Sequence, residues 1–144
     1  MDDIIQILLV EDNPADADLT SEKLEAGKIL HELSIVKDGV EAMDFLLKKS
    51  PYENAKRPDL VLLDLNLPRK DGREVLADMK AIPELKAIPV VVLTSSQAEV
   101  DIARTYELQA SAYVTKPVDL GGFGQIVKAI ENFWFSVVRF PPKG

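Results

Sequence analysis

Short runs of nearly continuous apolar residues alternate along the chain with longer stretches whose apolar residues recur at helical spacing. Each run has the length of a β-strand, and continuous apolarity is typical of strands that are covered on both faces. Five such runs are present, at residues 4–10, 33–36, 60–65, 89–93 and 112–114. The pattern therefore predicts a parallel sheet whose strands alternate with helices.

The helical stretches have recognisable starts and ends. The first begins at Asn13-Pro14, because Asn caps a helix and Pro suits its first turn, and it ends near Gly27. Five strand-helix pairs joined by right-handed crossovers predict an α/β fold, a doubly wound five-stranded parallel sheet of order 2-1-3-4-5 with helices on both faces. The other helices are predicted over about 39–49, from 72 to just before Pro83, over about 97–108, and from 120 to about 138.

Composition narrows the class of protein. With 47% apolar and 28% charged residues, the chain is expected to form one globular domain over residues 1–144 and not a disordered tail. The 17 basic and 24 acidic side chains give a net charge of −7, which argues against nucleic acid as a partner. The absence of Cys, of a basic signal peptide and of a long apolar segment favours a cytoplasmic protein with no membrane association.

Acidic residues follow two of the predicted strands. Glu11 and Asp12 come after the first strand and Asp64 after the third, at the edge of the sheet where such folds bind ligands. Clustered carboxylates repel one another unless a cation neutralises them, and hard oxygen ligands favour Mg²⁺. A strand-end acid can instead simply cap the next helix, as Asp12 and Asn13 could, but a cap needs only one acid. The three acids together therefore predict a magnesium site.

Two more polar residues end the remaining strands, Thr94 after the fourth and Lys116 after the fifth. A hydroxyl and an ammonium beside a bound metal make a receptor for a phosphoryl group, and Asp64 then becomes a candidate nucleophile that forms an aspartyl-phosphate. Taken alone, Thr94 would be an ordinary strand-end hydroxyl and Lys116 a solvated ammonium. Their placement beside the acids is what favours phosphoryl chemistry.

The ordered set of these residues resembles the receiver domain of bacterial two-component response regulators over nearly the whole chain. Each element of the motif is weak evidence by itself, but the order and the spacing of the whole set are specific to this family. The matching residues are the acidic pair Glu11-Asp12, the D-x-N-x-P segment from Asp64 to Pro68, Asp71-Gly72, Thr94 and Lys116-Pro117.

The resemblance implies a flavodoxin-like fold in which Asp64 accepts a phosphoryl group from a histidine kinase. Thr94 and Lys116 would contact the phosphate, and Tyr113 would be an aromatic switch that moves inward with Thr94. It also implies a cis bond between Lys116 and Pro117, and a signalling protein that catalyses only its own phosphorylation and dephosphorylation. The implied Mg²⁺ ligands are Glu11, Asp12, Asp64 and the backbone carbonyl of Asn66.

Two features depart from a minimal receiver. The last helix continues into an aromatic tail, from about 133 to 144, with more aromatic residues than one helix face can bury against a sheet. The connection over 48–58 is also long and is expected to be exposed. Both features look like those of stand-alone response regulators of phytochrome-type histidine kinases. This likeness implies a phytochrome kinase as donor, a homodimer through the C-terminal helix and tail, and no output domain.

The residues alone leave two other functions open. One is a metal-dependent phosphatase that resembles haloacid dehalogenases and uses the same aspartyl-phosphate chemistry. Those enzymes place an Asp as general acid two residues after the nucleophile, whereas this chain has Asn66 at that position. The other is an interaction module that does not use phosphate.

The single histidine, His31, follows a predicted helix and is expected to lie on the surface.

Overall fold

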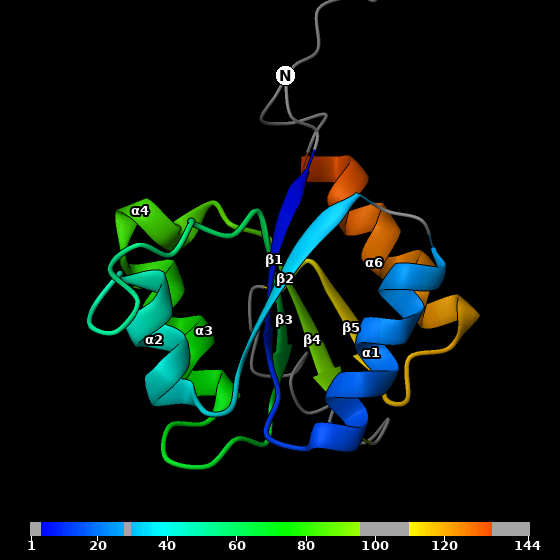
Figure 1. The fold of residues 1–144 in the computed structure, drawn as a ribbon, viewed down its shortest axis with the longest axis horizontal. Coiled ribbons are helices and arrows are strands. Elements are labelled where there is room, and N and C mark those ends of the chain that lie inside the picture. The colour runs from blue at the N-terminus through cyan, green and yellow to red at the C-terminus, as the bar shows by residue number, and fades with distance from the viewer. Residues whose placement is uncertain (1–3, 28–29, 96–109, 134–144) are drawn as a thin grey trace, which may run out of the picture.

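A computed structural model describes residues 4–27, 30–95 and 110–133. Its centre is a five-stranded parallel sheet of order β2-β1-β3-β4-β5, as the sequence predicts (Figure 1). All four neighbouring pairs of strands are parallel, so the carboxyl ends of the strands lie at one edge. The strands are β1 (Ile5–Val10), β2 (His31–Val36), β3 (Leu60–Asp64), β4 (Val90–Thr94) and β5 (Ala112–Thr115).

Helices cover both faces of the sheet. Helices α1 and α6 lie on one face, and α2 and α3 with the short α4 lie on the other (Figure 1). The helix predicted over 97–108 and the part of the last helix beyond 133 lie outside the described residues. The described helices are α1 (Pro14–Ala26), α2 (Gly39–Leu46), α3 (Gly72–Ala81), α4 (Pro83–Lys86) and α6 (Leu120–Phe133).

The core is divided by the sheet into two apolar clusters. Side chains of β1, β3 and β4 alternate between the faces: Leu8 and Leu63 pack with α2 and α3, whereas Leu9 and Leu62 pack with α1 and α6. Every residue of β3 and β4 is buried, which explains why these strands read as continuous apolar runs. This burial holds the carboxyl ends of the strands in place.

Side-chain caps set the starts of α1, α2 and α3. Asn13 accepts hydrogen bonds from the backbone N–H groups of Ala15 and Asp16, so α1 begins at Pro14 as predicted. Asp38 caps α2 in the same way by accepting from the N–H of Glu41. Asp71 opens α3, where it forms a reciprocal capping box with Glu74. These helices therefore start at residues that their caps define.

The structure differs from the sequence predictions in three places. Helix α2 ends at Leu46 and not near 49. Pro83 stops α3 as expected, because Pro disfavours helical geometry at the preceding residue, but it also occupies the first position of α4, which was not predicted. His31 begins β2, and its side chain is only 4% exposed, with Nε2 3.8 Å from a Glu25 carboxylate oxygen, so the prediction of a surface histidine was wrong.

The long connection before β3 is largely exposed, as predicted, but it is anchored. The ring of Tyr52 lies against that of Phe45, with 5.3 Å between their centroids. The Ser50-Pro51 peptide bond in this connection is cis.

Among the helices within the described residues, none is long and apolar enough to cross a membrane.

Candidate functional site

Three carboxylates meet at the carboxyl edge of the sheet. Glu11 directly follows β1 and Asp64 ends β3, and these strands are neighbours. One carboxylate oxygen from each of Glu11, Asp12 and Asp64 lies within 4.8 Å of the others. Glu11 and Asp64 are buried, whereas Asp12 is exposed. The structure thus brings together the three acids predicted from the sequence, in a cluster that opens to solvent at Asp12.

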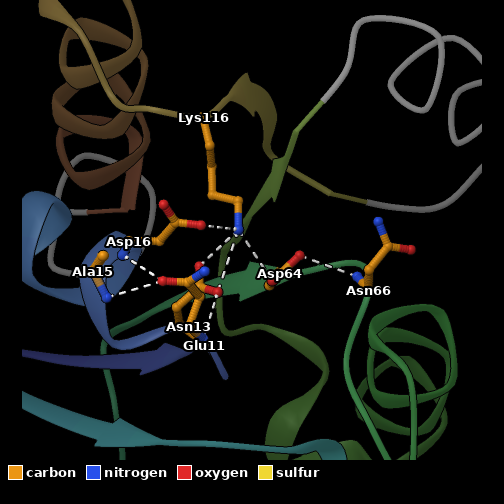
Figure 2. Close-up of polar contacts among 7 residues, drawn as sticks. All are labelled: Glu11, Asn13, Ala15, Asp16, Asp64, Asn66 and Lys116. Carbon is orange, nitrogen blue, oxygen red and sulfur yellow. Dashed lines mark hydrogen bonds and ion pairs between the residues drawn. The ribbon is translucent and has the colours of Figure 1, made fainter.

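Lys116 supplies a positive charge to this cluster (Figure 2). Its Nζ lies 3.0 and 3.2 Å from the two carboxylate oxygens of Glu11 and 3.2 Å from Oδ2 of Asp64. The Lys116 side chain is 9% exposed, so these contacts are largely shielded from water. The buried acids are therefore paired with an internal ammonium.

A fourth acid, Asp16, also contacts this ammonium. Oδ2 of Asp16 lies 3.0 Å from Lys116 Nζ and reaches it from the first turn of α1 (Figure 2). Asp16 was not predicted as a site residue, because it does not directly follow a strand. The available signal was an acid in the first turn of a helix that starts at the same edge of the sheet.

Burial and charge shift the ionisation of the central pair. Burial and, after it, the neighbouring Asp64 carboxylate raise the pKa of Glu11 to about 7, against the opposing effect of Lys116. Burial by itself lowers the pKa of Lys116, but the hydrogen bonds to Asp16 and Glu11 and the charges of Asp64 and Glu11 outweigh it, so the net shift is upward. The cluster thus holds Lys116 charged, and its surplus of carboxylates suits a further cation.

Asp64 is held from both sides. Its Oδ1 accepts a hydrogen bond of 3.0 Å from the backbone N–H of Asn66, and its Oδ2 faces Lys116. Asn66, the residue whose carbonyl was predicted as a metal ligand, is exposed directly beside the cluster. The loop returns toward Asp64 at the start of α3, where the N–H of Gly72 donates to the carbonyl of Leu65 over 2.9 Å. The Asp-Gly pair of the motif therefore anchors this loop.

Thr94 and Tyr113 lie on the other side of β3. Thr94 is the wholly buried last residue of β4, and its carbonyl accepts a 2.6 Å hydrogen bond from the backbone N–H of Lys116. This bond joins the ends of β4 and β5. Tyr113, on the edge strand β5, is half-buried and packs against the core cluster on the α2 and α3 face. The Lys116-Pro117 bond is cis, as the family resemblance implies.

The donor set fits a divalent cation. The cluster offers hard carboxylate oxygens from three residues close together, one of them open to solvent, which suits Mg²⁺ or Mn²⁺. The same set, with an ammonium and a strand-end hydroxyl, also suits a phosphoryl group. These residues end or closely follow β1, β3, β4 and β5, so the geometry of the site depends on the sheet.

Comparisons with known proteins agree with this chemistry. The family model for the response regulator receiver domain matches residues 7–131. The response regulator Rcp1 of Synechocystis sp. is 53% identical over 135 residues, which cover 94% of this chain and 92% of that protein. Receiver domains bind divalent metal ions, and one solved structure of Rcp1 is described as Mn²⁺-bound; it is 52% identical, with a TM-score of 0.74 and coverage of 95% and 99% of the two chains.

Two other solved structures extend the likeness to light signalling. The phosphorylated cyanobacterial phytochrome response regulator RcpA is 51% identical, with a TM-score of 0.75 and coverage of 97% and 99%. The bacteriophytochrome response regulator AtBRR is 46% identical, with a TM-score of 0.82 and coverage of 92% and 94%. These matches do not support the phosphatase alternative. The chain belongs to the response regulator receiver-domain family of two-component signalling proteins and is homologous to phytochrome response regulators.

Proposed function

We propose that Asp64 accepts a phosphoryl group from a phytochrome-type histidine kinase in a Mg²⁺-dependent reaction that changes a partner-binding surface. The observation that carries this proposal is the meeting of the Glu11, Asp12 and Asp64 carboxylates within 4.8 Å, with Lys116 Nζ bound to Glu11 and Asp64. The homology to phytochrome response regulators supports the choice of kinase. Phosphotransfer from such a kinase would place the protein in the cytoplasm.

The proposed transfer forms one bond and breaks another. A carboxylate oxygen of Asp64 attacks phosphorus, the new O–P bond forms, and the P–N bond to the kinase histidine breaks with its electron pair returning to the imidazole nitrogen. Attack of water on the same phosphorus would later return Asp64 to its free carboxylate and release inorganic phosphate. The chain would therefore act on no substrate other than its own phosphoryl group.

Mg²⁺ would be held by the carboxylates of Glu11, Asp12 and Asp64 and by the backbone carbonyl of Asn66. The donor chemistry supports this assignment, because three carboxylates converge and Asp12 is open to solvent. When bound, the ion supplies positive charge that offsets the charge of the phosphoryl oxygens. Asp64 remains oriented by the N–H of Asn66 on its Oδ1.

Lys116 and Thr94 would respond to the new group. The Lys116 ammonium already lies 3.2 Å from Asp64 Oδ2, so it is close to the position of a phosphoryl group on that residue. The Thr94 hydroxyl would donate to another phosphoryl oxygen, and Tyr113 would move inward into the space that Thr94 leaves. Because Tyr113 belongs to the edge strand β5, this movement would change the outer surface at that side of the sheet.

We also propose a homodimer formed through the C-terminal helix and the tail from about 133 to 144. The tail residues from 134 onward lie outside the described part of the chain. Helix α6 already uses Ile126 and Ala129 to cover the sheet. The aromatic residues that follow in the sequence exceed the needs of that contact and support a second copy as their partner.

Phosphorylation by acetyl phosphate tests the proposed function. The wild-type protein with Mg²⁺ is expected to take up one acid-labile phosphate, measured by mass spectrometry of the intact chain. Asp64→Asn is expected to abolish the uptake, whereas Asp18→Asn, which makes the same change at an exposed position of α1, leaves it intact. Stoichiometric labelling of Asp64→Asn would refute the assignment.

A further inference from the structure

All three N–H donors of the Lys116 ammonium have carboxylate acceptors within reach in this structure. An ammonium has three N–H donors, and Lys116 Nζ lies within hydrogen-bond distance of three carboxylates: Glu11 at 3.0 Å, Asp64 at 3.2 Å and Asp16 at 3.0 Å. A phosphoryl group on Asp64 would be a new acceptor for the same donors. Four carboxylate oxygens of these residues already lie within 3.2 Å of Lys116 Nζ, so a phosphoryl oxygen must share or displace one of these contacts.

Asp16 differs from the other two partners in its origin. Glu11 and Asp64 lie at strand ends, but Asp16 lies in the first turn of α1. Its backbone N–H donates a hydrogen bond of 3.1 Å to Oδ1 of the capping residue Asn13. This bond fixes the start of the helix. Helix α1 in turn is packed on the sheet by buried Leu24. The carboxylate is thus held beside the cluster by a helix that contains none of the predicted site residues.

Asp16 also differs in its exposure to water. The side chains of Glu11 and Asp64 are 0% and 5% exposed, but that of Asp16 is 31% exposed. A carboxylate that loses a hydrogen bond must regain one from water, and a buried carboxylate does this at a higher cost than an exposed one. Asp16 is therefore the partner that Lys116 can leave most readily.

We propose that Asp16 is a positioning residue that holds Lys116 in the resting site and opposes phosphorylation of Asp64, an inference that rests on the proposed function. Two effects act in the same direction. Asp16 competes for the donor that the phosphoryl group needs, and its negative charge repels a group that carries a charge of about −1.5 to −2. The opposite holds for a divalent cation, because the same carboxylate adds negative potential to the cation site.

Asp16→Asn therefore separates this role from a merely structural one. With saturating Mg²⁺, we expect the initial rate of phosphorylation by acetyl phosphate to rise about two- to fivefold, the size expected for loss of a partly exposed charge pair. In the free protein, we expect the Kd for Mg²⁺, measured by calorimetry, to rise by a similar factor. Loss of local structure would weaken both properties, so the opposite changes are diagnostic. Asp18→Asn, with the same change of charge in the same helix, is the matched control.

The outcomes discriminate between the two proposals. Wild-type protein that takes no phosphate would overturn the proposed function and this inference with it. Wild-type protein that is phosphorylated, with Asp16→Asn unchanged or slower relative to Asp18→Asn, would overturn only the role of Asp16. If Asp16→Asn does not fold, as judged by circular dichroism, Asp16→Ser serves as the second neutral variant, and Asp16→Glu is expected to restore wild-type behaviour.

Discussion

Gly72 packs directly on the backbone of Asp64, so closely that a Cβ at Gly72 would overlap the carbonyl oxygen of Asp64 and lie 2.8 Å from Cα of Leu65. The obstacle is backbone, which cannot turn aside as a flexible side chain can. Helix α3 is thereby fitted against the end of the strand that carries the proposed phosphoacceptor. This contact gives a steric reason for the glycine of the Asp-Gly pair.

Replacement of Gly72 by Ala is expected to displace either α3 or the end of β3. We expect a loss of about 1–3 kcal/mol in the free energy of unfolding, measured by urea denaturation, and slower phosphorylation of Asp64. Gly124→Ala is the control, because a Cβ there meets nothing within 4 Å and alanine favours the helix. Equal stabilities of the two variants would contradict the steric argument.

Replacement of Lys116 by Gln leaves the buried Glu11 and Asp64 without their cation. We expect the metal-free protein to lose about 3 kcal/mol of stability, because removal of one partner leaves charge buried and uncompensated. Saturating Mg²⁺ should raise the melting temperature of this variant more than that of the wild type. The comparison is with Lys128→Gln, which neutralises an exposed lysine of α6. A Mg²⁺ effect no larger than in the wild type would argue against Lys116 as the internal counter-charge.

Removal of the α1 cap by Asn13→Ala should cost about 1 kcal/mol, because the N–H groups of Ala15 and Asp16 lose their acceptor. The chemical denaturation midpoint measures this loss, with Glu22→Ala, an exposed substitution inside α1, for comparison. The change should also loosen Asp16 and so shift the phosphorylation rate in the direction expected of Asp16→Asn. A rate that falls in proportion to stability would show instead that α1 matters only for folding.

Deletion of residues 134–144 is expected to convert the proposed homodimer to a monomer. The physical reason is the loss of the aromatic surface assigned to the second copy. Light scattering of the full chain and the truncated chain measures the change in mass. Circular dichroism of the truncated chain is the control for folding. A full chain that is already monomeric would rule out this mode of assembly.

The sheet and the acidic cluster could be predicted because both follow from local pattern and topology. Buried strands such as β3 and β4 have no polar residue until they end, so Asp64 and Thr94 mark those ends in the sequence. Once the strand order is given, parallel strands bring such ends together. The placement of Glu11, Asp12 and Asp64 needed no knowledge of side-chain packing.

The parts that were missed depend on packing between distant segments. Asp16 contacts Lys116 across 100 positions of sequence, and the contact arises from how α1 lies on the sheet. His31 begins an edge strand, and edge strands tolerate polar residues, so the apolar pattern placed the start of β2 too late. Pro83 has two compatible roles, as a stop for one helix and a start for the next, and only the backbone path selects both.

The pairing of Lys116 with three carboxylates has a consequence for the protein between signals. Because the ammonium is part of the chain, the crowded acids have a counter-ion at any metal concentration, and the fold should persist in a chelator. Phosphorylation would then find this counter-charge already in place beside Asp64. For Lys116 itself, it would require only the exchange of a carboxylate contact for a phosphoryl oxygen.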